Sequence, residues 1–291
     1  MTTRLLFILS SERSGSTLTR VILGANGRVV APAEMFLMRY PDFHSFLELK
    51  SVAMESLVEF FDLVGQPKSA AEITAHCRDL DMLEVYRWLL SFLGPEQILL
   101  DKTPAYANDG ETLRRSRPLD PFYIWLVRHP LAVIESHVRL KHREHHDGSP
   151  RGWARWARDS VVEGFDQYLA GGLSPLARQR EIKWVLQQTI IREFLAWVPE
   201  DRQCRIRFED LVTDPERQVE RLCAAIGVPL EPAMLEACGA RKVMNVHLGD
   251  PNFHKHDRID PAMANGWREL FSEDQLTLET RRLMDAIDVA R

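Results

Sequence analysis

Residues 5–19 constrain the fold of this chain more than any other stretch of its sequence. The apolar run 5–9 predicts a buried β-strand, and a loop of small and polar residues separates it from a helix that begins near Ser16. In such a junction several backbone N–H groups point at one place, and the helix macrodipole favours negative charge there. With the fixed positive charge of Arg13, this stretch predicts a site for a phosphate or sulfate ester.

The loop departs from the ATP-binding pattern G-x-x-x-x-G-K-[ST]. Ser10 stands where the first glycine would be, and Ser16 stands where the lysine would be, so a γ-phosphate would lose its main contact. The basic residue comes earlier in the loop, at Arg13. On its own, the loop is also compatible with a serine- and glycine-rich connector that binds nothing.

A second strand-to-helix junction lies more than a hundred residues further along the chain. The apolar run 122–127 predicts another buried strand, which is followed by Arg128 and by a helix that starts at Pro130. A planar guanidinium at this position can bind a phosphate through two hydrogen bonds, and Ser136 can add a hydroxyl. The alternative is that Arg128 pairs with a carboxylate and that Ser136 is an ordinary helix residue.

The two junctions, in this order, resemble those of sulfotransferases that use 3′-phosphoadenosine 5′-phosphosulfate (PAPS). Two more stretches resemble elements of this family, Lys102-Thr-Pro-Ala-Tyr106 and Arg207-Phe-Glu-Asp-Leu211. A narrower resemblance, to the sulfotransferase domains of olefin-forming polyketide synthases, comes from Asp-Pro-Asn-Phe at 250–253 and from His256. Those domains sulfate a β-hydroxyl group on an acyl chain that is bound to a carrier protein.

The resemblance implies that PAPS is the sulfuryl donor and that three groups of residues bind it. One of these groups, Arg241 and Lys242, belongs to an Arg-Lys-Gly element in the family, but Val243 replaces the glycine of that element here. Lys102, at a strand end, would stabilise the charge that develops on the departing phosphate. The implied binding residues are Arg13, Ser14, Gly15, Ser16 and Thr17 of the loop, then Arg128 and Ser136, and finally Arg241 and Lys242.

The acceptor hydroxyl needs a general base. Aryl and steroid sulfotransferases carry a histidine where Pro104 stands in this chain, so the base must come from elsewhere. Glu34 is the first candidate, because several bacterial and glycan sulfotransferases place a catalytic glutamate shortly after the first helix. His256 is the second candidate and Glu111 a weaker third. The alternative for Glu34 is a helix-terminus or surface carboxylate, and the alternative for His256 is a solvated loop histidine.

The rest of the sequence predicts an α/β fold with a mostly parallel central sheet, because strand-like and helix-like segments alternate. The resemblance makes this a P-loop-like fold of three layers. We expect one domain over residues 1–291, with a helical insertion at 31–96 and a loop-rich C-terminal lid at 239–264. The predicted strands are 5–9, 98–101, 122–127 and 205–208, and the predicted helices are 43–64, 70–79, 82–93, 153–169, 176–197, 215–226 and 272–289.

Composition limits the partners. A formal net charge of −5 gives no global basic field, which argues against nucleic acid. The absence of a long apolar run or a signal peptide, and four cysteines without paired spacing, predict a cytoplasmic protein that does not enter a membrane. Four histidines at 137, 142, 145 and 146 lie among basic residues, so we expect no metal site there.

The expected partner is therefore a hydroxylated small molecule or an acyl substrate, and the narrower resemblance adds an acyl carrier protein. Sulfation of a sugar or a phenol is the alternative. A P-loop kinase and a non-catalytic nucleotide-binding module are lower-ranked alternatives, since the loop lacks the kinase lysine while Arg13, Lys102, Arg128 and Ser136 are all present.

Overall fold

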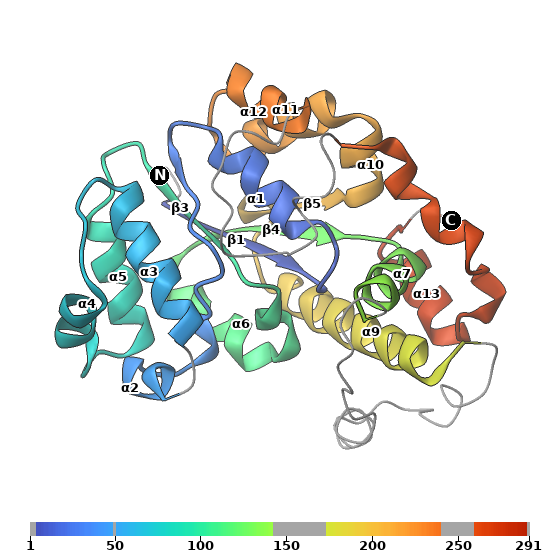
Figure 1. Ribbon diagram of the computed structural model, residues 1–291, viewed down its shortest axis with the longest axis horizontal. Helices are drawn as coiled ribbons and strands as arrows, with labels where there is room; N and C mark the ends of the chain where they lie inside the picture. Colours follow the sequence, from blue (N-terminus) through green and yellow to red (C-terminus); the bar gives the residue numbers. More distant parts are fainter. Residues whose placement is uncertain (1–3, 49–50, 142–172, 240–258, 290–291) are drawn as a thin grey trace.

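A five-stranded parallel sheet forms the centre of the molecule (Figure 1). The computed structural model describes residues 4–48, 51–141, 173–239 and 259–289. The strand order is β2-β3-β1-β4-β5, and every neighbouring pair is parallel, which confirms the predicted α/β class. The strands are β1 (Leu5–Ser10), β2 (Val29–Val30), β3 (Ile98–Lys102), β4 (Phe122–Val127) and β5 (Gln203–Arg207).

Side chains of β1 enter two different cores. Leu5, Phe7 and Leu9 pack into one core, whereas Leu6 and Ile8 pack into the other. This follows from the geometry of a strand, in which successive side chains point to opposite faces of the sheet. A strand that is covered on both faces is apolar at every position, which explains why its sequence shows a continuous run rather than an alternation.

Helices cover both faces of the sheet, which gives the three predicted layers. The core that contains Leu6 is closed by α1 (Ser16–Gly24), α10 (Phe208–Thr213), α11 (Pro215–Ile226) and α12 (Pro232–Gly239). The core that contains Phe7 is larger, and Figure 1 shows most of the remaining helices on that side. These are α2 (Phe43–Leu47), α3 (Ser51–Leu63), α4 (Ala70–Cys77), α5 (Met82–Ser91), α6 (Gly110–Ser116), α7 (Pro130–Lys141), α9 (Pro175–Leu195) and α13 (Leu278–Ala286).

Two of the predicted helices were wrong in their extent. The segment 43–64 forms two helices, α2 and α3, and its apolar spacing gave no sign of the division because Phe46 and Ala53 are seven residues apart. The predicted helix 272–289 begins only at Leu278. Its expected capping box between Ser272 and Gln275 does form, but it closes the short 3₁₀ turn η10 (Glu273–Gln275), and a second cap at Thr277 starts α13.

Short elements escaped prediction. β5 ends at Arg207 rather than at 208, because Phe208 already begins α10. The two-residue strand β2 and the helices α6, α10 and α12 were not predicted. Of the segment 239–264, Gly239 ends α12 and the 3₁₀ helix η8 (Pro261–Ala264) closes the range, while residues 240–258 lie outside the described residues. The predicted helix 153–169 also lies outside them.

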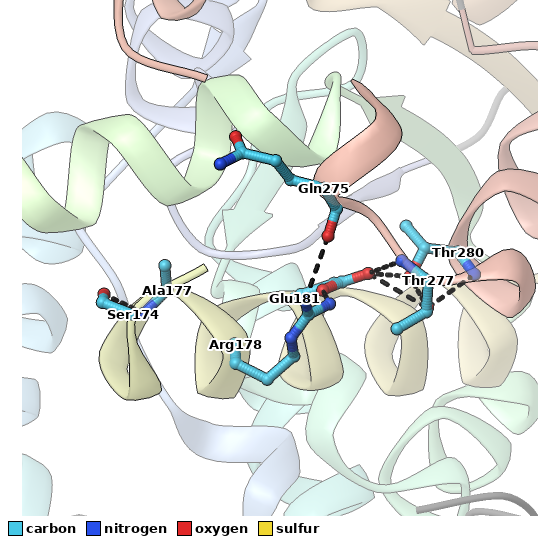
Figure 2. Close-up of polar contacts among 7 residues, drawn as sticks. All are labelled: Ser174, Ala177, Arg178, Glu181, Gln275, Thr277 and Thr280. Atoms are coloured by element: carbon cyan, nitrogen blue, oxygen red, sulfur yellow. Dashed lines mark hydrogen bonds and ion pairs between the residues drawn. The ribbon is translucent and has the colours of Figure 1, made fainter. Parts of the chain in front are cut away.

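The C-terminal segment, residues 259–289, is attached to α9 through a buried carboxylate (Figure 2). Glu181, which is fully buried, accepts hydrogen bonds from Thr277 N at 2.8 Å, from Thr277 Oγ1 at 3.1 Å and from Thr280 Oγ1 at 2.5 Å. It also pairs with Arg178, whose guanidinium donates to the carbonyl oxygen of Gln275 at 3.0 Å. These contacts fix α13 and the turn before it on the N-terminal half of α9.

Candidate active site

Three neighbouring strands bring the predicted site residues to one edge of the sheet. β1 leads into the loop 11–15, β3 ends at Lys102, and Arg128 follows β4 directly. Because the three strands are parallel and adjacent, their carboxyl ends meet, which is where α/β proteins bind ligands. Residues from three distant parts of the sequence therefore surround the N-terminus of α1.

The loop has the backbone geometry of an anion site. Arg13 and Gly15 both adopt left-handed conformations, with φ values of 66° and 88°. Gly15 is the N-cap of α1 and has no side chain that could accept from the first N–H groups of the helix. Ser14 is buried, and its hydroxyl bonds that of Ser11 at 2.7 Å, which stiffens the loop from inside. The free helix N-terminus can accept a phosphate or sulfate group.

Arg128 holds this loop in place. One of its terminal nitrogens donates to the carbonyl oxygen of Arg13 at 2.8 Å, and the other donates to the carbonyl oxygen of Met263 at 3.3 Å. Its guanidinium lies 4.2 Å from the ring centroid of Phe208. The same ring packs under Gly15, where an added Cβ would lie 2.2 Å from Cδ2 of Phe208. Phe208 is a site residue that sequence reasoning missed, although it belongs to the quoted 207–211 stretch.

The two predicted phosphate elements touch each other. Nε of Arg13 donates a hydrogen bond to Oγ of Ser136, on α7, at 3.0 Å. The arginine of the loop and the serine of the second junction thus lie in one cluster, together with Arg128. Ser16 and Thr17, which follow the loop in the sequence and form the first turn of α1, are also buried.

Lys102 connects the loop to the predicted general base. Its ammonium lies 2.5 Å from Oε1 of Glu34 and 3.4 Å from Oγ1 of Thr17. The lysine is 1% exposed, whereas the side chain of Glu34 is 28% exposed. Burial lowers the pKa of Lys102, and the negative charge of Glu34 opposes that shift. The structure therefore brings Thr17, Lys102 and Glu34 into one line of contacts.

Helix α3, which belongs to the helical insertion, hydrogen-bonds to the backbone at and beside Glu34. The Ser56 hydroxyl of α3 donates to the backbone oxygen of Glu34 at 3.0 Å, and Glu59 of the same helix accepts from Ala33 N at 2.7 Å. Arg20 of α1 is buried beside them, and burial lowers its pKa while the charges of Glu59 and Glu34 oppose this. Part of the insertion 31–96 is thus built into the site.

Helix α9 supports the first half of the loop. Glu12 forms an ion pair with Lys183, a largely buried residue of α9. Five residues further along α9, Gln188 donates to Oγ of Ser11 at 3.4 Å and accepts from the indole nitrogen of Trp125 at 2.8 Å. The two partners in each of these contacts are more than 50 positions apart in the sequence, and no motif or periodicity connects them, so sequence reasoning gave no signal for them.

The C-terminal segment packs against the end of β4. The ring of Trp267 stacks on His129 with centroids 4.2 Å apart and an interplanar angle of 8°. His129 is buried, and burial lowers its pKa to about 3. Its Nδ1 accepts from Leu131 N at 3.2 Å, so the imidazole is a neutral, structural group. Together with the contact between Arg128 and Met263, this packing links the C-terminal segment to the nucleotide-site candidates.

One predicted site residue does not join the cluster, and three others lie outside the part of the chain that the structure describes. His256, Arg241 and Lys242 lie outside the described residues. Glu111, the weakest base candidate, is exposed on α6 and pairs with Arg114 of the same helix at 3.1 Å. Within the described ranges, no three histidine, cysteine or acidic side chains gather as a metal site would. No helix among those ranges is both long and apolar enough to cross a membrane.

Comparisons with known proteins agree with this geometry. A family model described as "Sulfotransferase family" matches residues 6–232. The sulfotransferase domain from the curacin biosynthetic pathway is 31% identical, with a TM-score of 0.77, over 100% of this chain and 99% of that chain. The sulfotransferase domain of the Synechococcus PCC 7002 olefin synthase is 26% identical, also with a TM-score of 0.77, over 100% and 96%.

More distant proteins share the fold or part of the sequence. A sulfotransferase from Alicyclobacillus acidocaldarius has a TM-score of 0.53 at 13% identity, over 98% of this chain and 96% of that chain. The nodulation protein NoeE of Sinorhizobium fredii is 24% identical over 288 residues, which cover 94% of this chain. This chain spans 62% of the length of that relative.

Proposed function

Because this chain belongs to the sulfotransferase family, we propose that it moves a sulfuryl group from PAPS to a hydroxyl group, and that the acceptor is the β-hydroxyl of a carrier-bound acyl chain. The observation that carries this proposal is the position of Lys102. Its ammonium contacts both Thr17, in the first turn of α1 after the loop, and Glu34. One cation thus joins a leaving-group site to a carboxylate.

The site fits a donor with two separate anionic groups. The N-terminus of α1, with the left-handed backbone at Arg13 and Gly15, suits the phosphosulfate group. Arg128 and Ser136 suit the 3′-phosphate, and Arg13 lies between the two places because it bonds Ser136. PAPS supplies the sulfuryl group and the leaving phosphate. This assignment is supported by the cluster of positive charge and by the family, and Arg241 and Lys242 join it by resemblance.

The chain's own residues would do two things during transfer. As the bond between sulfur and the leaving phosphate oxygen breaks, negative charge grows on that oxygen, and the Lys102 ammonium stabilises it together with the first N–H groups of α1. As the bond between sulfur and the acceptor oxygen forms, the hydroxyl proton moves to the carboxylate of Glu34. His256 remains the second candidate for this base.

The acceptor is proposed from similarity in sequence. Sulfotransferase domains of the curacin pathway and of an olefin synthase align with this chain over its whole length at 31% and 26% identity. The stretch 250–253 and His256 resemble the same kind of domain. A carrier-bound β-hydroxyacyl chain, presented by an acyl carrier protein, is therefore our first choice, ahead of a free sugar or a phenol.

An acceptor screen tests this function. The wild-type protein is incubated with PAPS and with a β-hydroxyacyl carrier protein, a sugar or a phenol, and each product is examined by intact mass spectrometry for one added sulfuryl group. We expect sulfation of the carrier-bound chain without added Mg²⁺. Sulfation of only the sugar or the phenol would overturn the acceptor, and turnover only with ATP and Mg²⁺ would overturn the sulfotransferase activity.

Three variants test the roles in the site. Glu34→Gln keeps the shape of the side chain but cannot accept a proton, so we expect it to lower turnover by a factor of about 10² to 10⁴. Glu111→Gln is the matched control, because that glutamate is exposed and away from the cluster. Lys102→Ala should lower turnover far more than affinity for PAPS. Full activity of Glu34→Gln would exclude Glu34 as the base and leave His256.

A further inference from the structure

A fully buried carboxylate lies directly before Lys102 in β3. Asp101 accepts three hydrogen bonds from side-chain hydroxyls. Thr103 Oγ1 donates to its Oδ1 at 2.9 Å, Tyr106 donates to its Oδ2 at 2.9 Å, and Tyr86 donates to the same oxygen. No step of the proposed reaction uses this group. Its burial and its saturated hydrogen bonding require another explanation, because a buried carboxylate is costly.

Two of the three hydroxyls also accept a hydrogen bond from the backbone of another segment. Oγ1 of Thr103 accepts from the N–H of Phe36 at 3.3 Å, and the hydroxyl of Tyr106 accepts from the N–H of Met38 at 3.2 Å. A hydroxyl has one proton to donate and two lone pairs. Since Asp101 takes both protons, the lone pairs of Thr103 and Tyr106 are directed to the N–H groups of Phe36 and Met38.

The segment that is held in this way carries Glu34. Phe36 has a φ of 57°, a left-handed conformation that a phenylalanine keeps only when its surroundings impose it. On the other side, Ser56 and Glu59 of α3 hold the backbone at residues 33 and 34. The Glu34 carboxylate thus projects from a short stretch that is fixed at both ends.

We propose that Asp101 is a positioning residue, which acts through the hydroxyls of Thr103 and Tyr106 to hold the backbone at Phe36 and Met38 so that the carboxylate of Glu34 stays at Lys102. The inference rests on the proposed function, in which Glu34 is the general base and Lys102 stabilises the leaving phosphate. It predicts that the network serves the geometry of the base and not the binding of the nucleotide.

The chain offers a matched pair of variants. Tyr86 and Tyr106 both donate to Oδ2 of Asp101, both are fully buried, and their hydroxyls lie 3.3 Å apart. Of the two, the structure gives only Tyr106 a hydrogen bond to the 36–38 backbone. Tyr106→Phe and Tyr86→Phe therefore remove equivalent donors from Asp101 but differ in the link to the segment that carries Glu34.

The first measurement does not depend on activity. Hydrogen exchange of the backbone N–H groups of residues 36–38 is followed in the wild type and in both variants, with the melting temperature recorded for each. We expect faster exchange at Met38 in Tyr106→Phe than in Tyr86→Phe. Equal exchange rates in the two variants would overturn the link between Tyr106 and this segment.

The second measurement asks whether the network acts through Glu34. We expect Tyr106→Phe to lower kcat by about 10²-fold, as for a misplaced catalytic group, with little change in the affinity for 3′-phosphoadenosine 5′-phosphate. Tyr86→Phe should have a much smaller effect on kcat. In a Glu34→Gln background Tyr106→Phe should cause little further loss, because residues that act together are not additive.

The outcomes separate this inference from the proposed function. An inactive wild type, or a fully active Glu34→Gln, would overturn the role of Glu34 and with it the role of Asp101. If Glu34→Gln is impaired but the effects of Tyr106→Phe and Glu34→Gln simply add, the proposed function stands and the positioning role of Asp101 is wrong.

Discussion

Single residues set the shape of the loop 11–15, the proposed anion site. At Gly15 the backbone has a φ of 88°, and the ring of Phe208 fills the space that a side chain would need. At Arg13 a non-glycine residue takes a similar conformation, with Arg128 bound to its carbonyl oxygen. The loop therefore depends on one residue without a side chain and on one arginine that is held from outside.

Replacement of Gly15 tests this dependence. Gly15→Ala should weaken binding of 3′-phosphoadenosine 5′-phosphate, measured by calorimetry, because both the left-handed backbone and the contact with Phe208 oppose the new Cβ. Gly227 is a matched control, since its φ is 77° but nothing lies within 4 Å of an added Cβ. Gly227→Ala should cost about 1–3 kcal/mol of stability and leave nucleotide affinity unchanged. Equal affinities in the two variants would contradict the role of Gly15.

The titration of Asp101 gives a second prediction at this scale. Burial raises the pKa of its carboxyl from 3.8 to about 6, with its hydrogen bonds opposing the shift. A raised folded-state pKa means that the folded protein binds this proton more tightly than the unfolded chain, so its contribution to stability is present below about pH 4 and is lost as the pH rises to about 6.

Urea unfolding of the wild type and of Asp101→Asn between pH 4 and pH 6 measures this contribution. We expect the free energy of unfolding of the wild type to fall, relative to the variant, as the pH rises across that interval. A constant difference between the two proteins would contradict the assignment.

Among the secondary-structure elements, α9 connects most parts of the site. Along its length it binds the C-terminal segment through Glu181, the loop through Lys183, and β4 through Gln188. The sequence predicted this helix at 176–197, close to the observed Pro175–Leu195, which Ser174 caps. The partners of its polar side chains could not be predicted, since they lie in segments that are remote in sequence.

The contribution of the Glu181 network can be measured by chemical unfolding. Glu181→Ala leaves the buried guanidinium of Arg178 without its carboxylate and removes the acceptor of Thr277 and Thr280, so we expect a loss of about 3–5 kcal/mol in the free energy of unfolding. Glu193→Ala, at an exposed position of the same helix, should change stability little. A similar small effect of both variants would show that the network does not fasten the C-terminal segment.

At the scale of the whole molecule, the sequence predicted the central strands and most of the long helices. Continuous apolar runs marked β1, β3 and β4, and the residues after them do meet at one edge of the sheet. Short elements such as β2 and α10 carry too few residues for a periodic signal. The supporting residues Glu12, Phe208 and Asp101 were missed because burial of a polar or aromatic group beside a loop is decided by the tertiary fold.

The intact molecule should recognise the two phosphates of its nucleotide together. We expect 3′-phosphoadenosine 5′-phosphate, at about 100 times its dissociation constant, to raise the free energy of unfolding by roughly 2.7 kcal/mol. The same concentration of ATP with Mg²⁺ should raise it much less. Arg128→Ala should abolish the difference between the two ligands. Equal stabilisation of the wild type by both nucleotides would contradict the assignment of the two phosphate elements.

The central place of β1 in the sheet has a consequence for synthesis on the ribosome. Leu5 pairs with Leu99 of β3, and Leu6 pairs with Phe122 of β4, so neither neighbour of β1 exists until roughly a hundred further residues have been made. At a synthesis rate of about 5–20 residues per second, these residues take about 5–20 s to make. During that time the apolar stretch of β1 has no neighbour on either edge, and an unpaired strand edge can pair with another chain.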